Sequence, residues 1–257
     1  MLTEERQKQI VQAVEESGTA TVTELAERFD TSESTIRRDL DRLDSEGLLV
    51  KVRGGASSIS DAIVSQRAYT TRDVSLSERL GLNAEEKERI GAYAAALVGP
   101  DDFVFVDAGS TTFSLVKHLR NASATFVVNS LMHARVLTSQ GCRVIVTGGE
   151  LKPNTEALVG SDAISALARY NFTLGFWGAN AVTMEQGYTT PESNEAAFKR
   201  IAMEHTIGHA RYVLADSSKI GMVASITFAD FTSATLITCG DVDPSYAACE
   251  NVLEVSA

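Results

Sequence analysis

The chain has 257 residues, of which 44% are hydrophobic and 22% charged, and its net charge is −11. These values predict one or two folded domains with ample core, and the acidic balance excludes a protein that binds nucleic acid through bulk charge alone. No stretch reaches the ~20 apolar residues that cross a bilayer, no signal-peptide run follows Met1, and the three cysteines lack metal-ligand spacing. We therefore expect a cytoplasmic protein with reduced thiols, no metal site, no cofactor and no membrane contact.

Residues 21–53 show the order of elements of a DNA-reading domain. Thr21 and Glu24 predict a capping box that starts a short helix, and residues 30–32 break that helix before a second one begins. Gly47 ends the second helix, and the alternation that follows predicts a small β-ribbon. Together these elements predict a winged helix-turn-helix, whose second helix enters the major groove of double-stranded DNA. The side chains expected to face DNA are Ser34, Thr35, Arg37, Arg38, Arg42, Lys51 and Arg53.

The charge distribution of this first part limits how it can bind. Residues 1–57 carry eight Lys and Arg against twelve Asp and Glu, a net charge of −4. The basic residues gather on the predicted groove face, so we expect weak affinity for random DNA and dependence on a few placed contacts. Useful affinity would then require a homodimer or homotetramer that presents several reading heads.

A polar stretch at residues 58–76 follows this domain. It is either a flexible tether or an ordered hinge, because Ile63, Val64 and Tyr69 could dock against a neighbouring subunit. The expected division is a winged helix-turn-helix at 1–57, a linker at 58–76 and an effector-binding domain at 77–257.

From Ala84 onward, short β-rich runs alternate with amphipathic helices, which is the pattern of a parallel sheet covered on both faces. Five of these runs end in glycine, hydroxyl, amide or carboxylate residues. Ligands bind beyond the carboxyl ends of strands in open parallel sheets, so these five ends form the predicted pocket. The runs are 103–106, 126–128, 144–146, 174–176 and 212–214.

The clearest chemistry follows the run 103–106. Gly109 lets the backbone approach a ligand, residues 110–112 supply hydroxyl groups, and the next helix directs free amides and its positive end to the same point. This arrangement suits a phosphate, although a Gly-Ser-Thr turn can also merely cap a helix. No Walker or Rossmann glycine pattern is present, so a nucleotide is not indicated. The available counter-charges are Lys87, Lys152 and Lys219.

Several segments together resemble the DeoR family of bacterial sugar-metabolism repressors. Residues 32–40 and 52–56 are similar to its DNA-binding end, and residues 107–112 and 215–219 are similar to its phosphate loop and its late D-x-x-K segment. The R-x-x-x-N-x-x-x-K pattern at the start of its second domain is matched by Arg79, Asn83 and Lys87.

The resemblance covers about Leu2 to Phe231 and has two departures. The stretch Ser65 to Arg72 lengthens the linker. Asn180 stands where many relatives have an acidic residue, which affects the identity of the ligand but not its class.

The resemblance implies a fold, an effector and a site. The implied fold is α/β, with the N-terminal winged helix-turn-helix followed by a mostly parallel sensor domain that resembles sugar-phosphate isomerases. The implied effector is a phosphorylated sugar that weakens operator binding. Its phosphate is expected at the phosphate loop, with its hydroxyls on Asp107 and Glu195. The expected effector-binding residues are Lys87, Asp107, Gly109, Ser110, Thr111, Thr112, Asn129, Gly148, Gly149, Asn180, Glu195 and Lys219.

A second function class remains open, namely a sugar-phosphate isomerase-like enzyme fused to a DNA-binding head. Isomerisation needs a positioned general base, for which Asp107, Asp216 or Glu195 is available, with Lys219 as a partner. The complete winged helix ahead of the pocket favours sensing, and we expect no turnover.

Other polar and aromatic residues have plainer explanations. Glu192 fits the first turn of a helix as well as it fits a sugar site. We expect most of the four histidines at the surface or at helix caps, Trp177 in the core, and Met203 with Ile207 in a core stripe.

Overall fold

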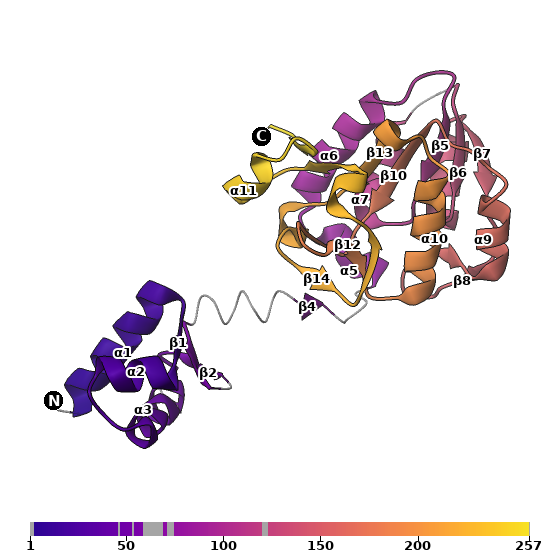
Figure 1. Ribbon diagram of the computed structural model, residues 1–257. Coiled ribbons are helices and arrows are strands. Elements are labelled where there is room, and N and C mark those ends of the chain that lie inside the picture. Colours follow the sequence, from indigo (N-terminus) through magenta and orange to yellow (C-terminus); the bar gives the residue numbers. More distant parts are fainter. Residues whose placement is uncertain are drawn as a thin grey trace. The chain divides into compact units, whose positions relative to one another are not determined.

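The computed structural model describes residues 3–45, 47–52, 54–58, 69–70, 75–119 and 123–256. The chain forms two compact units, Met1–Ala68 and Tyr69–Ala257 (Figure 1). Arg53 and most of the expected linker lie outside the described residues.

The first unit packs three helices against a small antiparallel sheet with the strand order β1-β3-β2. Its elements are α1 (Thr3–Ser17), β1 (Thr19–Thr21), α2 (Val22–Arg28), α3 (Glu33–Ser45), β2 (Val50–Val52) and β3 (Gly55–Ser57). The core joins Ile10 of α1, Leu25 of α2 and Leu40 of α3, which are all at most 2% exposed. Helix, turn, helix and ribbon therefore occur in the predicted order, which confirms the winged helix-turn-helix.

Local hydrogen bonds start the two helices of the helix-turn-helix. Thr21 Oγ1 accepts from the Glu24 amide at 3.2 Å, and the Glu24 carboxylate accepts from the Thr21 amide at 2.8 Å, so the capping box forms as predicted. Ser32 Oγ accepts from the Thr35 amide at 3.2 Å and caps α3. A buried carboxylate then joins α3 to α1, because Asp39 accepts from Arg6 at 2.7 Å and from Gln7 at 2.9 Å.

The second unit is built on a seven-stranded sheet in the order β17-β16-β13-β10-β5-β6-β7, with every neighbouring pair parallel. The five predicted runs all form strands, and two further strands extend the sheet. The strands are β5 (Phe103–Val106), β6 (Thr125–Val128), β7 (Arg143–Val146), β10 (Leu174–Gly178), β13 (Arg211–Leu214), β16 (Thr235–Thr238) and β17 (Val252–Glu254).

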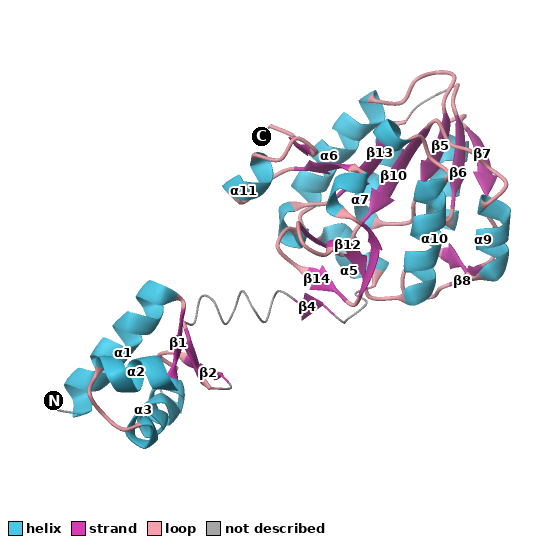
Figure 2. Ribbon diagram, in the orientation of Figure 1, coloured by secondary structure: helices cyan, strands magenta, loops and turns pink. Residues whose placement is uncertain are grey.

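Helices cover both faces of this sheet (Figure 2). The helices of this unit are α5 (Leu76–Gly81), α6 (Ala84–Ala96), α7 (Ser110–His118), α8 (Leu131–Ser139), α9 (Ser161–Leu167), α10 (Ser193–Glu204) and α11 (Pro244–Ala247), with single 3-10 turns at η1 (Gly208–Ala210), η2 (Ser217–Lys219) and η3 (Phe231–Ser233). Alternate strand residues belong to two separate apolar clusters, with Phe105 in one and Val106 in the other. The mostly parallel α/β fold is thus confirmed.

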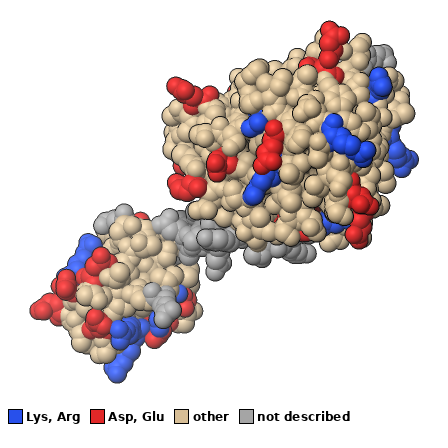
Figure 3. Space-filling model, turned by 45° about the vertical axis from the view of Figure 1, so that its right-hand side comes forward, with Lys and Arg blue, Asp and Glu red and all other residues tan. Residues whose placement is uncertain are grey.

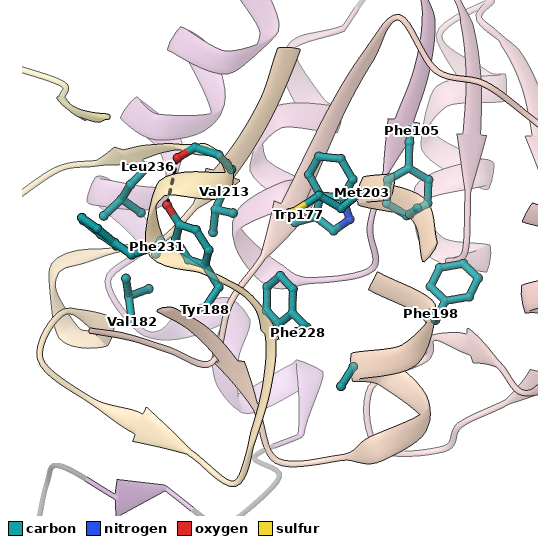
Figure 4. Close-up of a cluster of buried hydrophobic side chains, with 14 of the residues drawn as sticks. Phe105, Trp177, Val182, Tyr188, Phe198, Met203, Val213, Phe228, Phe231 and Leu236 are labelled. Carbon is teal, nitrogen blue, oxygen red and sulfur yellow. Dashed lines mark hydrogen bonds between the residues drawn. The ribbon is translucent and has the colours of Figure 1, made fainter. Parts of the chain in front are cut away.

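One of these clusters contains the chain's only tryptophan. Trp177 is fully buried 5.4 Å from the Phe105 ring, and Tyr188 donates its hydroxyl to the carbonyl of Ala234 at 3.2 Å (Figure 4). Met203 joins this core as predicted, but Ile207 is 46% exposed, so the predicted core stripe was wrong at that position because the helix ends at Glu204.

Three small sheets complete the unit. One is antiparallel, in the order β11-β12-β15, and two are strand pairs. Their strands are β11 (Ala181–Thr183), β12 (Gly187–Thr190) and β15 (Ile226–Ala229), the hairpin of β8 (Glu150–Leu151) with β9 (Leu158–Val159), and β4 (Tyr69–Thr70) with β14 (Val223–Ala224). β4 and the start of α5 fall inside the stretch 58–76 that was expected to be a linker. Because β4 pairs with β14, the second unit begins at Tyr69 rather than at residue 77.

Among the helices that the structure describes, none has the length and the apolar character needed to span a membrane. No group of three His, Cys, Asp or Glu within these ranges is arranged to hold a metal ion.

Candidate functional site

The outer face of α3 carries the predicted base-reading side chains. Arg37, Arg38 and Arg42 are exposed, as is Ser34, while Thr35 is half-buried. The opposite face is buried through Ile36, Leu40 and Leu43. The predicted amphipathic arrangement is therefore present, and the polar face is available to DNA.

Two cations on this unit have surface carboxylate partners. Arg37 pairs with Glu33 at 2.8 Å one turn earlier, and Lys51 of β2 pairs with Asp41. All four side chains are more than a third exposed. Such exposed pairs are weak, so DNA phosphates can replace the carboxylates at little cost. Basic and acidic side chains alternate on the surface of this unit (Figure 3).

In the second unit a pocket lies beyond the carboxyl ends of β5 and β10. Six predicted site residues line it: Gly109, Ser110, Thr111, Asn180, Glu195 and Lys219. Six residues outside the predicted set also line it: Arg79, Ala108, Thr155, Gly178, Ala179 and Lys199.

The N-terminus of α7 faces this pocket. Gly109 is its N-cap residue, and the amides of the first helical turn have no partner within the helix. The loop is fixed from behind, since the Ala108 amide donates to Asn129 Oδ1 at 2.7 Å and the Gly109 carbonyl accepts from Thr112 Oγ1 at 3.1 Å. Helix α6 also supports α7 closely, because a Cβ at Gly91 would lie 2.5 Å from the backbone of Ser114.

His133 of α8 holds the same loop. Its Nε2 lies 3.2 Å from the Gly109 carbonyl, and its ring stacks on Phe113 with centroids 5.7 Å apart. Burial lowers the pKa of His133 to about 4, although the bond to Gly109 opposes this shift. A neutral ring must donate from Nε2 to a carbonyl, which fixes its tautomer. His133 is fully buried and is therefore an exception to the expectation that most of the histidines lie at the surface or at helix caps.

Asp107, at the end of β5, forms a buried charge pair beneath the pocket. Lys199 of α10 donates to its carboxylate and also to the Gly178 carbonyl at 3.1 Å, and the Gly178 amide donates to Asp107 at 3.1 Å. Burial raises the pKa of the Asp107 carboxyl, and Lys199 opposes that shift. Lys199 was not predicted, although it stands one helical turn after Glu195.

Glu195 has bonding partners on both carboxylate oxygens. One oxygen accepts from Lys152 at 3.2 Å and Thr155 at 3.3 Å, and the other accepts from Thr190 at 3.1 Å. Burial alone would raise the pKa of Glu195, but Lys199 and Lys152 together lower it, so the group is a carboxylate at neutral pH.

Two neighbours of Glu195 differ in role. The Thr190 hydroxyl also lies 3.1 Å from Asn180 Oδ1, which joins Asn180 to the same network. Glu192 instead accepts from the amides of Asn194 and Glu195 and acts as the N-cap of α10, so it is a helix-cap residue.

Lys87 is close to the pocket but does not line it. It is 3% exposed, and its ammonium donates to the carbonyls of Arg79 at 2.5 Å and Leu82 at 2.6 Å. It also lies 3.8 Å from Asp216, whose other oxygen accepts from Asn83 at 2.8 Å. The sequence pattern of Arg79, Asn83 and Lys87 is thus a structural network that brings Arg79, rather than Lys87, into the pocket.

Five other predicted residues also lie outside the pocket lining. Asp107, Thr112 and Asn129 lie beneath the loop they support. Gly148 and Gly149 have positive φ angles of 76° and 103°. A Cβ at Gly149 would lie 2.6 Å from the Val159 carbonyl, so this glycine is needed for close packing.

Two family models match the chain. One is described as the DeoR-like helix-turn-helix domain and covers residues 6–62, and the other is described as the DeoR C terminal sensor domain and covers residues 82–240. The chain belongs to the DeoR family. It is therefore a transcriptional regulator, and the resemblance read from the sequence is confirmed.

Several DeoR-family regulators are similar over nearly their whole length. The HTH-type regulator FruR of Bacillus subtilis is 35% identical over 93% of this chain and 91% of its own. GlpR of Haloferax volcanii is 35% identical over 95% and 92%, and the lactose phosphotransferase system repressor of Streptococcus mutans is 31% identical over 95% of each chain.

Solved structures show more distant likeness. Ribose 5-phosphate isomerase A of Methanocaldococcus jannaschii is 16% identical with a TM-score of 0.40, over 54% of this chain and 55% of its own. The sorbitol operon regulator SorC of Klebsiella pneumoniae is 13% identical with a TM-score of 0.37, over 83% and 89%. Likeness at this distance assigns no activity to this DeoR-family chain.

Proposed function

We propose that this DeoR-family regulator represses a sugar-metabolism operon and that a phosphorylated sugar, bound in the pocket of the second unit, releases it from its operator. The observation that carries the proposal is the pocket's anion-binding character. It combines the free amides of α7, the hydroxyls of Ser110 and Thr111, and the cations Arg79 and Lys219. Neither cation forms an ion pair with any residue in the described ranges.

The polar residues beside this anion site suit sugar hydroxyls. Asn180 and Glu195 line the same pocket, and the Thr190 hydroxyl lies 3.1 Å from a side-chain oxygen of each. The cavity volume is about 30 Å³, well below the ~300 Å³ of typical small-molecule sites. A sugar phosphate therefore requires local rearrangement of the residues that line the pocket.

Sensing explains these contacts better than isomerisation. A general base needs a pKa near the working pH and a free oxygen directed at the substrate. The pKa of Glu195 is lowered, and both of its oxygens accept hydrogen bonds. Asp107 is paired with Lys199 beneath the pocket. We therefore propose that the protein binds a sugar phosphate without turnover.

The remaining parts of the proposal concern the assembly. The DNA-facing residues would be Ser34, Thr35, Arg37, Arg38, Arg42, Lys51 and Arg53. The first unit has a net charge of −4 over residues 1–57, so a single DNA-binding unit gives little affinity for DNA. We therefore propose that the protein acts as a homodimer or homotetramer. We place it in the cytoplasm.

Two measurements on the full chain test the function. Selection from a random duplex pool should yield a specific DNA sequence, and fluorescence anisotropy should then show release of that DNA by one of a set of pentose and hexose phosphates. The same compound should raise the melting temperature, since a ligand at a hundredfold its Kd adds about 2.7 kcal/mol to stability. Stabilisation without release, or conversion of the compound between aldose and ketose, would contradict the proposal.

A further inference from the structure

The two pocket cations without ion-pair partners among the described residues, Arg79 and Lys219, lie on separate segments of the second unit. Arg79 belongs to the short helix α5, and its Nε is buried without a hydrogen-bond partner in the described part of the chain. Lys219 is the last residue of η2 and lines the pocket together with Arg79. A buried guanidinium N–H is costly unless it finds an acceptor, so this side chain is prepared for an anion.

A buried network fixes the backbone of both segments. Lys87 donates to the Arg79 carbonyl and approaches Asp216, the residue directly before η2, while Asn83 donates to the same carboxylate. Burial lowers the pKa of Lys87, Asp216 opposes this, and the nearby charges of Lys219 and Arg79 add to the lowering. Lys87, Lys219 and Arg79 thus lie near two carboxylates, those of Asp216 and Glu86, and the positive charge in excess favours an anion.

Each segment also holds the chain where it enters the second unit. The Leu76 amide at the start of α5 donates to the Asn154 carbonyl at 2.9 Å. Four residues after Lys219, Val223 of β14 pairs with Tyr69 of β4. β4 precedes residues 71–74 in the sequence, and α5 follows them. Arg79 therefore lies on the first helix that the chain forms in the second unit. Lys219 lies just before β14, the strand that pairs with β4.

We propose that Arg79 and Lys219 clamp the effector phosphate against the N-terminus of α7, and that this clamp couples the pocket through β14 to β4 and through Arg79 to α5. The inference rests on the proposed function. A guanidinium donates two parallel hydrogen bonds to a phosphate, and the ammonium adds a third contact from the other segment. A phosphate that bridges both segments stabilises the arrangement of α5 and η2 in which both cations reach it, and hence favours that arrangement over any other.

The binding half of the clamp is tested on the full chain with inorganic phosphate, titrated at constant ionic strength and followed by thermal unfolding. Arg79→Gln and Lys219→Gln should each weaken phosphate binding by about tenfold or more. Arg79→Lys keeps the positive charge but cannot donate two parallel hydrogen bonds. Its affinity for phosphate should therefore lie between those of the two Gln variants and that of the parent. Arg89→Gln is the matched control, because Arg89 is a surface residue paired with Glu85 on α6. Parent-like phosphate binding by Arg79→Gln and Lys219→Gln would overturn the clamp.

The coupling half is tested with the double variant Tyr69→Pro, Thr70→Pro, which removes both amides of β4 without touching the pocket. The probes are fructose 1-phosphate, glucose 6-phosphate and ribose 5-phosphate, with release of the selected DNA as the readout. The variant should bind the active compound within about twofold of the parent yet lose the release of DNA. Parent-like release by this variant would overturn the coupling route. A parent that releases its DNA with no member of the full set of pentose and hexose phosphates would instead overturn the proposed function.

Discussion

Replacing Lys199 by methionine breaks the buried charge pair beneath the pocket. Lys199 is 5% exposed and Asp107 is 2% exposed. Methionine retains an unbranched apolar chain but removes the cation, so the Asp107 carboxylate keeps only the Gly178 amide at 3.1 Å and a long contact of 3.5 Å from Asn129. Removing one partner of a buried pair costs about 3–5 kcal/mol, because an uncompensated charge remains.

The loss of stability should depend on pH in a defined direction. Burial raises the pKa of Asp107 and Lys199 opposes that shift, so the pKa rises further in Lys199→Met. The folded variant then retains a proton that the unfolded chain, with an Asp pKa of about 3.9, has released. Because the folded state binds more protons, the unfolding free energy falls as pH rises from about 4 through the folded pKa, by up to about 1.4 kcal/mol per pH unit.

Urea unfolding followed by tryptophan fluorescence measures this loss. Trp177 is the single tryptophan and is fully buried in the second unit, so its signal reports that unit alone. Lys117→Met is the control, because Lys117 forms a half-exposed pair with Glu88 and should cost at most ~1 kcal/mol. Adding Asp107→Asn to Lys199→Met should remove the pH dependence. Equal losses for Lys199→Met and Lys117→Met, or equal stability of Lys199→Met at pH values near 5 and 8, would refute the reasoning.

Three further predictions concern the two ends of the protein. Arg37→Ala or Arg38→Ala should cost roughly 1–3 kcal/mol in operator binding, and a new selection should show lower sequence specificity at one base position. Lys51→Ala should instead weaken binding to all DNA sequences similarly and reduce the dependence of DNA affinity on salt concentration. Thr111→Glu should place a carboxylate against the phosphate, so anisotropy should show bound DNA that no sugar phosphate releases. Release of the DNA at the sugar-phosphate concentrations that act on the parent would show that the pocket is wrongly assigned. Leu40→Ala, at a fully buried position, should destabilise the first unit by about 2–5 kcal/mol in circular dichroism, and a neutral result would exclude it from the core.

The DNA-binding unit was predictable because its signals are local. The capping box of Thr21 and Glu24 and the apolar spacing of α2 and α3 depend on residues a few positions apart. The bond from Arg6 to Asp39 spans 33 positions, and no local pattern marks it. An acidic residue on the buried face of α3 was the one available indication of such a partner.

The pocket was predictable where one strand end supplies it. Gly109 and Thr111 follow β5 directly, so the strand and the glycine indicate them. Arg79 and Lys199 enter from α5 and α10, and their place depends on how helices far apart in the sequence pack. Lys87 was expected in the pocket for its charge, but it is used within the fold because it holds the carbonyls of α5.

Release of DNA by a sugar phosphate is the most direct test of the account. Full-length protein bound to its selected duplex should lose the DNA when the active sugar phosphate is added, and Arg79→Gln should require at least about tenfold more of the compound. Arg89→Gln should respond as the parent does. Binding of the sugar phosphate with no change in the affinity for DNA, in the parent protein and at saturating ligand, would contradict the central claim that this pocket controls the DNA-binding unit.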